Sequence, residues 1–228
     1  MRCPALVDCR TRIAWGNGPL DADVVVVGEA PAAGDPNAER WRGGNLTGFA
    51  YTSRHSGRRV RRLLADCGYE GRVYYTNAVK CFPRDPDADR ETNREPTATE
   101  LRRCRDHLRT ELATVGPAVV CPTGKHATES VLALAGPSIE DVADGFLDAV
   151  LRPLSVDLAV DEHRGSDEHR GSDGHRGSDG AAADEVGGPT LIPLLHPSYR
   201  DVWAARIGYG SGDAYRDAVR EALDAVVE

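Results

Sequence analysis

The run "VVVVGEAP", residues 24–31, constrains the fold of this chain more than any other part of its sequence. Four successive valines closed by a glycine and a proline are typical of a strand that is buried on both faces. Such a strand needs a layer of helices on each side of its sheet. The run is followed by a carboxylate, Glu29, which is either a solvated turn residue or part of a site at the end of the strand.

The rest of the chain alternates between strand-like and helix-like segments. Alternation of this kind is typical of a parallel sheet whose two faces are covered by helices. We therefore predict an α/β protein with a three-layer α/β/α architecture around a central, mainly parallel sheet of four strands. Pro193 fits poorly in a central strand, so the last strand is the least regular. The strands are predicted at 23–27, 72–79, 118–121 and 190–195, and the helices at 56–68, 97–116, 125–136 and 213–227.

Two of these helices carry clear end signals. The helix at 97–116 begins with a capping box, in which the side chains of Thr97 and Glu100 satisfy backbone N–H groups. In the helix at 56–68, apolar residues recur with the spacing of one helical face, and Gly68 ends the helix. Both helices are expected to pack one apolar face against the sheet.

Residues 161–180 hold a polar six-residue unit that is repeated three times. Because the unit contains no apolar residue, it cannot contribute to a core and is expected to be disordered. Its histidines are compatible with a metal-binding tract, but repeat expansion is the more common origin of such a pattern. We predict a single domain over residues 1–228 that is interrupted by this low-complexity insert at about 160–187.

The overall composition narrows the class of protein. The net charge of −8 by itself argues against a nucleic-acid partner. Few lysines beside abundant aspartate are typical of salt-adapted proteins such as those of haloarchaea. The chain has no run of about 18 apolar residues, so we expect no membrane partner. We expect a cytoplasmic monomer, in which the six cysteines are metal ligands or core residues rather than disulfides.

Polar residues stand where three of the predicted strands end. Glu29 follows the first strand, Asn77 lies near the end of the second, and His196 follows the fourth. Ligands of parallel sheets bind beyond the carboxyl ends of the strands. We therefore expect these three side chains to line one cleft. The alternative is that each of them caps a turn or packs after its strand.

Three motifs together resemble the uracil-DNA glycosylase superfamily, in its iron–sulfur branches: "GEAP" (28–31), "TNAVKC" (76–81) and "HPSY" (196–199). They occur in the family's order, and the resemblance covers residues 1 to about 135 and 189 to 227. It implies a DNA repair enzyme that hydrolyses the N-glycosidic bond of uracil in DNA and leaves an abasic site. Its partner would be uracil-containing DNA, from which the target nucleotide is flipped.

The resemblance also implies catalytic roles. Asn77 would read the edge of uracil, because an amide supplies both the donor and the acceptor that O4 and N3–H require. His196 would donate a hydrogen bond to uracil O2, where negative charge develops. Glu29 would position the hydrolytic water, with Asp35 as a second acidic candidate for this role.

Further residues are expected to contact the substrate. Tyr51 aligns with the aromatic residue that stacks on the flipped base in the family, and Phe49 is the alternative. Gly28, Ala30 and Ser198 belong to or adjoin the motifs and are expected to bind the substrate as well.

Two departures from the family pattern leave the substrate range open. Ala32 stands where the commonest iron–sulfur version has a glycine, and the stretch at 36–48, before Tyr51, is longer than in that version. Both departures favour a branch that accepts more deaminated bases, such as hypoxanthine and xanthine, whereas Asn77 and Glu29 favour uracil. The remaining alternative is a module that binds damaged or single-stranded DNA without turnover, because Ala30 stands where the classical enzymes have an aspartate.

The resemblance implies a structural [4Fe–4S] cluster held by four thiolates. Cys81 and Cys104 match two family ligands, and Cys3 matches one member of a pair that is normally spaced Cys-x2-Cys. Cys9 is the nearby candidate for the remaining ligand, and a zinc site with four thiolates is the alternative. The two other cysteines are expected to be ordinary core residues: Cys67 and Cys121.

Overall fold

A computed structural model describes residues 4–88, 92–157 and 188–227 of the chain. The low-complexity insert predicted at 160–187 lies outside the described residues, and so does Cys3.

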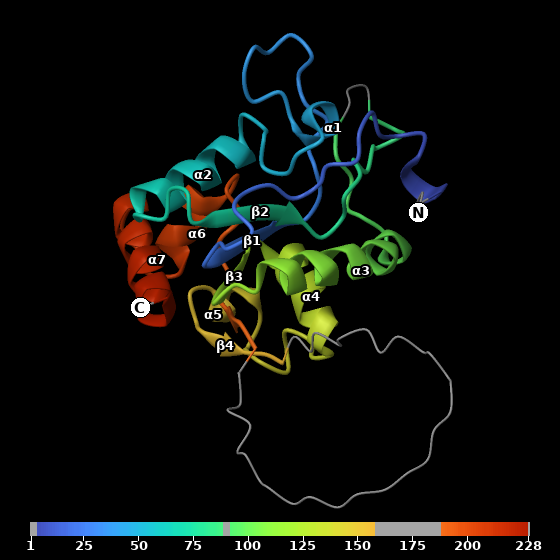
Figure 1. Cartoon of the computed structure of the whole chain (residues 1–228). Helices are drawn as coiled ribbons and strands as arrows, with labels where there is room; N and C mark the ends of the chain where they lie inside the picture. Colours follow the sequence, from blue (N-terminus) through green and yellow to red (C-terminus); the bar gives the residue numbers. More distant parts are fainter. Residues whose placement is uncertain (1–3, 89–91, 158–187, 228) are drawn as a thin grey trace, which may run out of the picture.

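One sheet of five strands lies at the centre of the molecule (Figure 1). Its strands are β1 (Val24–Gly28), β2 (Val73–Asn77), β3 (Val119–Pro122), β4 (Leu154–Ser155) and β5 (Thr190–Leu191). Their order across the sheet is β2-β1-β3-β5-β4. All neighbouring pairs are parallel except β4 with β5, which is antiparallel. The predicted α/β fold with a mainly parallel sheet is therefore confirmed.

Helices cover both faces of this sheet. The helical elements are η1 (Pro4–Leu6), α1 (Gly44–Thr47), α2 (Ser56–Asp66), α3 (Ala98–Val115), α4 (Lys125–Ala135), α5 (Phe146–Ala149), α6 (Arg200–Arg206) and α7 (Gly212–Val227). Helices α2, α6 and α7 lie on one side of the sheet, and α3 and α4 lie on the other (Figure 1). No helix in the described part of the chain combines the length and the hydropathy of a membrane span.

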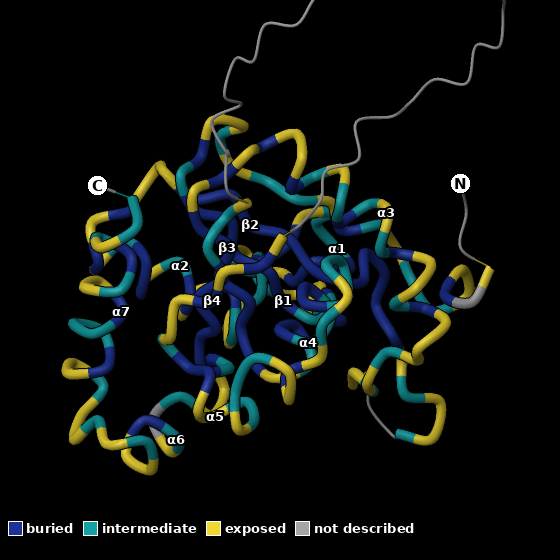
Figure 2. Tube along the Cα trace, turned by 90° about the horizontal axis from the view of Figure 1, so that it is seen from below, coloured by how far each residue is buried: buried dark blue, intermediate teal, exposed yellow. Residues whose placement is uncertain are grey.

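The valines of β1 supply both halves of the core. Val24 and Val26 belong to the buried cluster that includes α2 and α7, and Val25 and Val27 belong to the one that includes α3 and α4. Side chains of a strand point alternately to its two faces, which explains this division. Figure 2 shows the central strands in the dark blue of buried residues. The strand is therefore buried on both faces, as its sequence predicts.

The structure contains a fifth strand that the prediction of four strands missed. β4 has two residues and forms the antiparallel edge, so it is too short to show an alternating pattern in the sequence. The strand predicted at 190–195 is reduced to Thr190–Leu191, which ends ahead of Pro193. A proline has no N–H to donate to a ladder, which explains why regular pairing ends there.

The capping box predicted at the start of α3 is present. The Thr97 side chain accepts a hydrogen bond from the backbone N–H of Glu100, and Glu100 Oε2 accepts one from the backbone N–H of Thr97 at 2.8 Å. Arg94 pairs with the same carboxylate, and its hydrogen bond is the main reason why the pKa of Glu100 is lowered. These contacts fix the beginning of the helix that carries Cys104 and Glu111.

The parallel register aligns the carboxyl ends of the three central strands. Gly28 pairs with Asn77, and Val27 pairs with Pro122. The backbone N–H of Thr123 then donates to the carbonyl of Val27 at 2.9 Å. The residues that follow these strands therefore emerge together at one edge of the sheet.

Candidate active site

A cavity of about 290 Å³ opens at the carboxyl edge of the sheet. Its walls come from the ends of β1 and β2, from the residue that follows β3, and from the loops before α2 and α6. All but one of the residues predicted to act on or bind the substrate line it: Gly28, Glu29, Ala30, Tyr51, Asn77, His196 and Ser198. A second cavity of about 560 Å³ shares Glu29, Thr123 and His196 with the first.

Asn77 lines the cavity and holds an unsatisfied donor. The residue is 3% exposed, and its Nδ2 is the only buried side-chain nitrogen or oxygen of the described residues without a hydrogen-bond partner. Gly28 allows this close placement, because a Cβ there would lie 2.5 Å from Asn77 Oδ1. An unpaired buried donor costs roughly 1–3 kcal/mol. An acceptor on a ligand in the cavity would recover this free energy.

His196 is held as a neutral imidazole. Its Nδ1 accepts a hydrogen bond from the backbone N–H of Ser198 at 3.2 Å, so we assign the ring proton to Nε2. Burial lowers the pKa of His196, and the nearby His126 lowers it further. At neutral pH, His196 is therefore an uncharged hydrogen-bond donor. Gly124 packs against it, since a Cβ on Gly124 would lie 3.1 Å from His196 Cβ.

Glu29 is the only carboxylate among the described residues that line the 290 Å³ cavity. Burial raises the pKa of Glu29 above the ordinary value. Positive charge on His126 acts in the opposite direction, and the negative charge of Glu95 raises the pKa again. The Nε2 of His126 lies 3.1 Å from Glu95 Oε1, so the two form a pair beside the cavity. A carboxylate in this setting can orient a water molecule and accept its proton.

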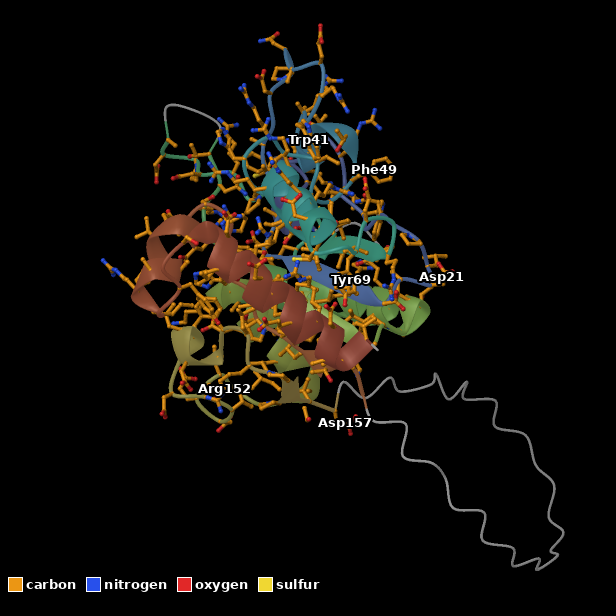
Figure 3. All side chains as sticks on the ribbon, turned by 90° about the vertical axis from the view of Figure 1, so that its left-hand side faces the viewer. Asp21, Trp41, Phe49, Tyr69, Arg152 and Asp157 are labelled. Carbon is orange, nitrogen blue, oxygen red and sulfur yellow. The ribbon has the colours of Figure 1, made fainter. Side chains whose placement is uncertain are left out.

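Tyr51 forms an aromatic wall of the cavity. Its hydroxyl lies 2.7 Å from Thr123 Oγ1, and its backbone carbonyl accepts a hydrogen bond from Arg61 Nε at 3.0 Å. These contacts hold Tyr51 at a φ of 54°, which few non-glycine residues adopt. Phe49, the alternative, is 50% exposed, does not line the cavity and lies at the periphery of the molecule (Figure 3). The structure brings Tyr51, and not Phe49, to the cavity.

Asp35 is the one predicted catalytic residue that does not line the cavity. It is exposed, and its Oδ1 accepts a hydrogen bond from the backbone N–H of Asn37 at 2.9 Å. Its own backbone N–H donates to the carbonyl of Arg42 at the same distance. Asp35 thus organises a turn in the loop after β1, and Glu29 is the carboxylate that the cavity contains.

The residues at the site that were not anticipated from the sequence include Thr123, Asn93 and His126. Thr123 follows β3, and the carboxyl-end rule could have found it, because a strand was predicted at 118–121. Asn93 lines the cavity and donates from Nδ2 to the carbonyl of Pro31 at 3.0 Å. It comes from a loop and carries no sequence signal. His126 acts on both Glu29 and His196 from the first turn of α4, which only the folded chain brings near them.

Three of the four predicted cluster ligands gather in one small buried group. Cys81 and Cys104 are buried in a separate cluster beside the sheet, and Cys9 packs against it. The guanidinium of Arg10 donates from Nη1 to Cys81 Sγ at 3.0 Å, which favours negative charge on that sulfur. The fourth predicted ligand, Cys3, lies outside the described residues.

The chemistry of this group suits an iron–sulfur cluster, because thiolates are the ligands of such clusters. Within the described ranges, which leave out Cys3, no three His, Cys, Asp or Glu side chains form a group that could hold a metal ion. A cavity of about 410 Å³ adjoins Cys81 and Cys104 and is also lined by Pro4, the sequence neighbour of Cys3. The cysteines predicted to be ordinary core residues lie in the buried cluster of α2 and α7: Cys67 and Cys121.

Comparison with known protein families shows which family this chain belongs to. The profile of the uracil DNA glycosylase superfamily matches residues 15–224. The chain belongs to this superfamily. The matched range contains the whole described lining of the 290 Å³ cavity, and it confirms the family predicted from the three motifs.

Several uracil-DNA glycosylases are similar to this chain. The type-5 uracil-DNA glycosylase of Pyrobaculum aerophilum is 34% identical over 164 residues, which cover 59% of this chain and 66% of the relative. The type-4 enzyme of Archaeoglobus fulgidus is 31% identical over 126 residues, or 55% of each chain. The type-4 enzyme of Thermotoga maritima is 26% identical over 198 residues, 86% of this chain and 75% of the relative. The chain thus spans just under two thirds of the first relative and just over half of the second.

We predict that Gly28→Ala destabilises the protein, because its Cβ would lie 2.5 Å from Asn77 Oδ1 and 3.0 Å from the Tyr51 hydroxyl. The free energy of unfolding, measured by urea denaturation, should fall by about 1–3 kcal/mol. Gly210→Ala is the control, because a Cβ there meets no atom within 4 Å beyond its chain neighbours. It should change the free energy of unfolding by less than about 0.5 kcal/mol. Equal stability of the two variants would contradict the tight contact at Gly28.

Proposed function

We propose that this protein is a monofunctional DNA glycosylase that hydrolyses the N-glycosidic bond of uracil in DNA and leaves an abasic site. The observation that carries the proposal is the unpartnered amide nitrogen of Asn77, buried in a cavity that Glu29, Tyr51 and His196 also line. The names of the relatives, type-4 and type-5 uracil-DNA glycosylases, support the same substrate.

The side chain of Asn77 can distinguish uracil from cytosine by the polarity of its hydrogen bonds. Its Nδ2 donates to O4 of uracil, and its Oδ1 accepts from N3–H. Cytosine presents a donor at the position of O4 and an acceptor at N3, so both contacts would oppose like groups. Each buried polar group left unpaired in this way costs roughly 1–3 kcal/mol. The flipped base would stack against Tyr51 while Asn77 reads its edge.

The neutral imidazole of His196 and the carboxylate of Glu29 act on opposite sides of the C1′–N1 bond, His196 on the uracil and Glu29 on the water that attacks the sugar. When the C1′–N1 bond breaks, its electron pair leaves with uracil, and negative charge develops on O2. The Nε2–H of His196 donates to that oxygen. Glu29 orients a water molecule whose oxygen bonds to C1′ and accepts the proton that this water releases. Backbone and side-chain groups of Gly28, Ala30 and Ser198 complete the binding surface.

The lysines of the chain support hydrolysis rather than strand cleavage through a Schiff base. The Nζ of Lys80 is buried and donates to three acceptors, on Thr76, Asn77 and Glu111. A lysine must be free and reachable to attack the sugar as a nucleophile. Lys125 lines the neighbouring 560 Å³ cavity and not the 290 Å³ cavity that Asn77 lines, and its Nζ lies 3.6 Å from Glu129 Oε1. The proposal is therefore an enzyme that leaves the DNA backbone intact.

We expect Asn77→Ala to abolish most uracil release, because the variant loses both contacts to the base. His196→Ala should lower turnover by about 10²–10³, the usual effect of removing one donor to a developing anion. The measurement is cleavage of a uracil-containing oligonucleotide, scored with and without alkali. Breaks at uracil should depend on alkali.

Asn77→Asp is the matched variant, and it should shift selectivity toward cytosine. Near-normal turnover of Asn77→Ala would contradict the assignment of the pocket. Breaks without alkali, or borohydride trapping of protein on DNA, would contradict hydrolysis without lyase chemistry. Oligonucleotides with hypoxanthine or xanthine test the broader substrate range, and binding without any release would identify a non-catalytic DNA-binding module.

We predict an acid limb in the pH profile of kcat/KM. The reaction needs ionised Glu29 and neutral His196, and both forms are lost as the pH falls. Because burial raises the pKa of Glu29, the limb should lie at higher pH than for an exposed carboxylate. His126→Gln should move it to still higher pH, because positive charge on His126 lowers the pKa of Glu29 and of His196.

The control for this pH profile is His107→Gln. His107 packs against Trp15 with ring centroids 5.4 Å apart, and it lines the 410 Å³ cavity beside Cys81 and Cys104 rather than the 290 Å³ cavity that holds Glu29 and His196. The acid limb should stay in place in this variant. A limb that moves to lower pH in His126→Gln would show that His126 does not act on Glu29 as argued.

We further propose that Cys3, Cys9, Cys81 and Cys104 hold a [4Fe–4S] cluster with a structural role. The grouping of three of these cysteines, the adjoining cavity and the nearby guanidinium of Arg10 support this donor set. Such a cluster would tie the N-terminal segment to the loop after β2 and to α3. It takes no part in the hydrolytic step.

Protein purified without oxygen should therefore be brown and contain about four irons per chain. Cys9→Ala should lose the colour and lower the thermal midpoint. Cys67→Ala and Cys121→Ala should keep the colour, because these cysteines lie in the other core. Stoichiometric zinc without iron, or a cluster that survives Cys9→Ala unchanged, would overturn this ligand set.

A further inference from the structure

A buried ammonium group lies directly behind Asn77. Lys80 is 1% exposed, and its Nζ lies 2.5 Å from Glu111 Oε2. The same Nζ donates to Thr76 Oγ1 at 2.6 Å and to the backbone carbonyl of Asn77 at 2.7 Å. Three acceptors thus match the three protons of the ammonium. A buried charge is tolerated only where such bonds satisfy it, so the geometry around Lys80 is narrowly defined.

The carboxylate of Glu111 extends this network to three parts of the fold. Its Oε2 also accepts a hydrogen bond from the hydroxyl of Thr76 on β2. Its Oε1 accepts one from the backbone N–H of Gly16, in the segment before β1, at 3.0 Å. Helix α3, which carries Glu111, is therefore joined to β2 and to the N-terminal segment through one charge pair.

The carbonyl of Asn77 receives its hydrogen bond from this network. Among the described strands, β2 pairs only with β1, and Asn77 is its last residue. On its other side, Tyr75 of β2 forms an isolated antiparallel bridge with Asn17. On one side the register with Gly28 holds the strand end. The second contact does not come from the sheet: the ammonium of Lys80 donates a hydrogen bond to the Asn77 carbonyl. The backbone that aims the Asn77 side chain is therefore fixed by two independent contacts.

We propose that Lys80 is a positioning residue, whose ammonium holds the Asn77 peptide in the orientation that lets the side chain read the base. The inference rests on the proposed function. Because Asn77 Nδ2 has no partner within the described chain, the direction of the amide depends on its backbone and on packing. Without the ammonium, the carbonyl is released and the peptide retains one of its two contacts, the hydrogen bond from the Ala78 N–H to the Gly28 carbonyl at 2.7 Å, so it can shift. A displacement of about 1 Å at a reacting centre can cost 10²-fold in rate.

A double-mutant cycle on the full-length protein tests this role. Turnover and KM on uracil-containing DNA are measured for the unmodified protein, Lys80→Met, Asn77→Ala and the double variant, well below the thermal midpoint of each. We expect Lys80→Met to lower kcat by about 10²-fold in the unmodified background. In the Asn77→Ala background the same change should have little further effect, because the positioned group is already absent.

Leu223→Ala is the matched control for destabilisation. Leu223 is fully buried on α7, in the core that lies on the other side of the sheet from α3 and Glu111. Leu223→Ala should change kcat by the same factor in the unmodified protein and in the Asn77→Ala variant. An equal effect of Lys80→Met in the two backgrounds would mean that Lys80 is merely structural.

Lys80→Met leaves the buried carboxylate of Glu111 without its counter-charge, which can prevent folding. The paired substitution Lys80→Met/Glu111→Gln removes both charges. If Lys80→Met does not fold, this pair takes its place in the double-mutant cycle. Its thermal midpoint should recover while its kcat stays low. Normal kcat in this folded variant would overturn the inference. An unmodified protein that releases no uracil would overturn the proposed function as well, whereas an additive cycle overturns the role of Lys80 alone.

Discussion

Burial of β1 on both faces is the constraint on which the rest of the structure depends. Its valines divide between two cores, so helices must cover each side of the sheet, and polar groups can enter only where strands end. Because β2 and β3 run parallel to β1 and in register with it, their carboxyl ends open at one edge. Glu29, Asn77 and His196 meet in one cavity for this reason, although His196 is more than a hundred residues from the other two.

The same burial sets the proton states of the site. Removal from water disfavours charge, so the pKa of Glu29 is raised and that of His196 is lowered. A neutral histidine that donates from Nε2 and a carboxylate with a raised pKa suit the proposed reaction, in which the leaving group gains negative charge while water loses a proton. His126 connects the two, since its charge lowers the pKa of both groups.

Much of the site could be predicted because its residues stand in short motifs at strand ends. Asn77 and Tyr51 reach the cavity as expected, since each lies next to an element whose pattern is clear in the sequence. Asp35 does not, because its position depends on how the loop after β1 turns, and its carboxylate satisfies that turn instead. Asn93 arrives from a loop without periodicity, and no local rule connects it to the cavity.

The sequence by itself determined the parallel α/β architecture, the double burial of β1 and the family, because these depend on local patterning and on short motifs. Tertiary structure alone decided which groups face one another across long stretches of chain. The Lys80–Glu111 pair behind Asn77 and the approach of His126 to Glu29 and His196 belong to this second class. Hydrophobic periodicity tells which face of an element is buried but not which polar groups from other elements will meet there. Strand register and helix packing determine these contacts between polar groups, and both exist only in the folded chain.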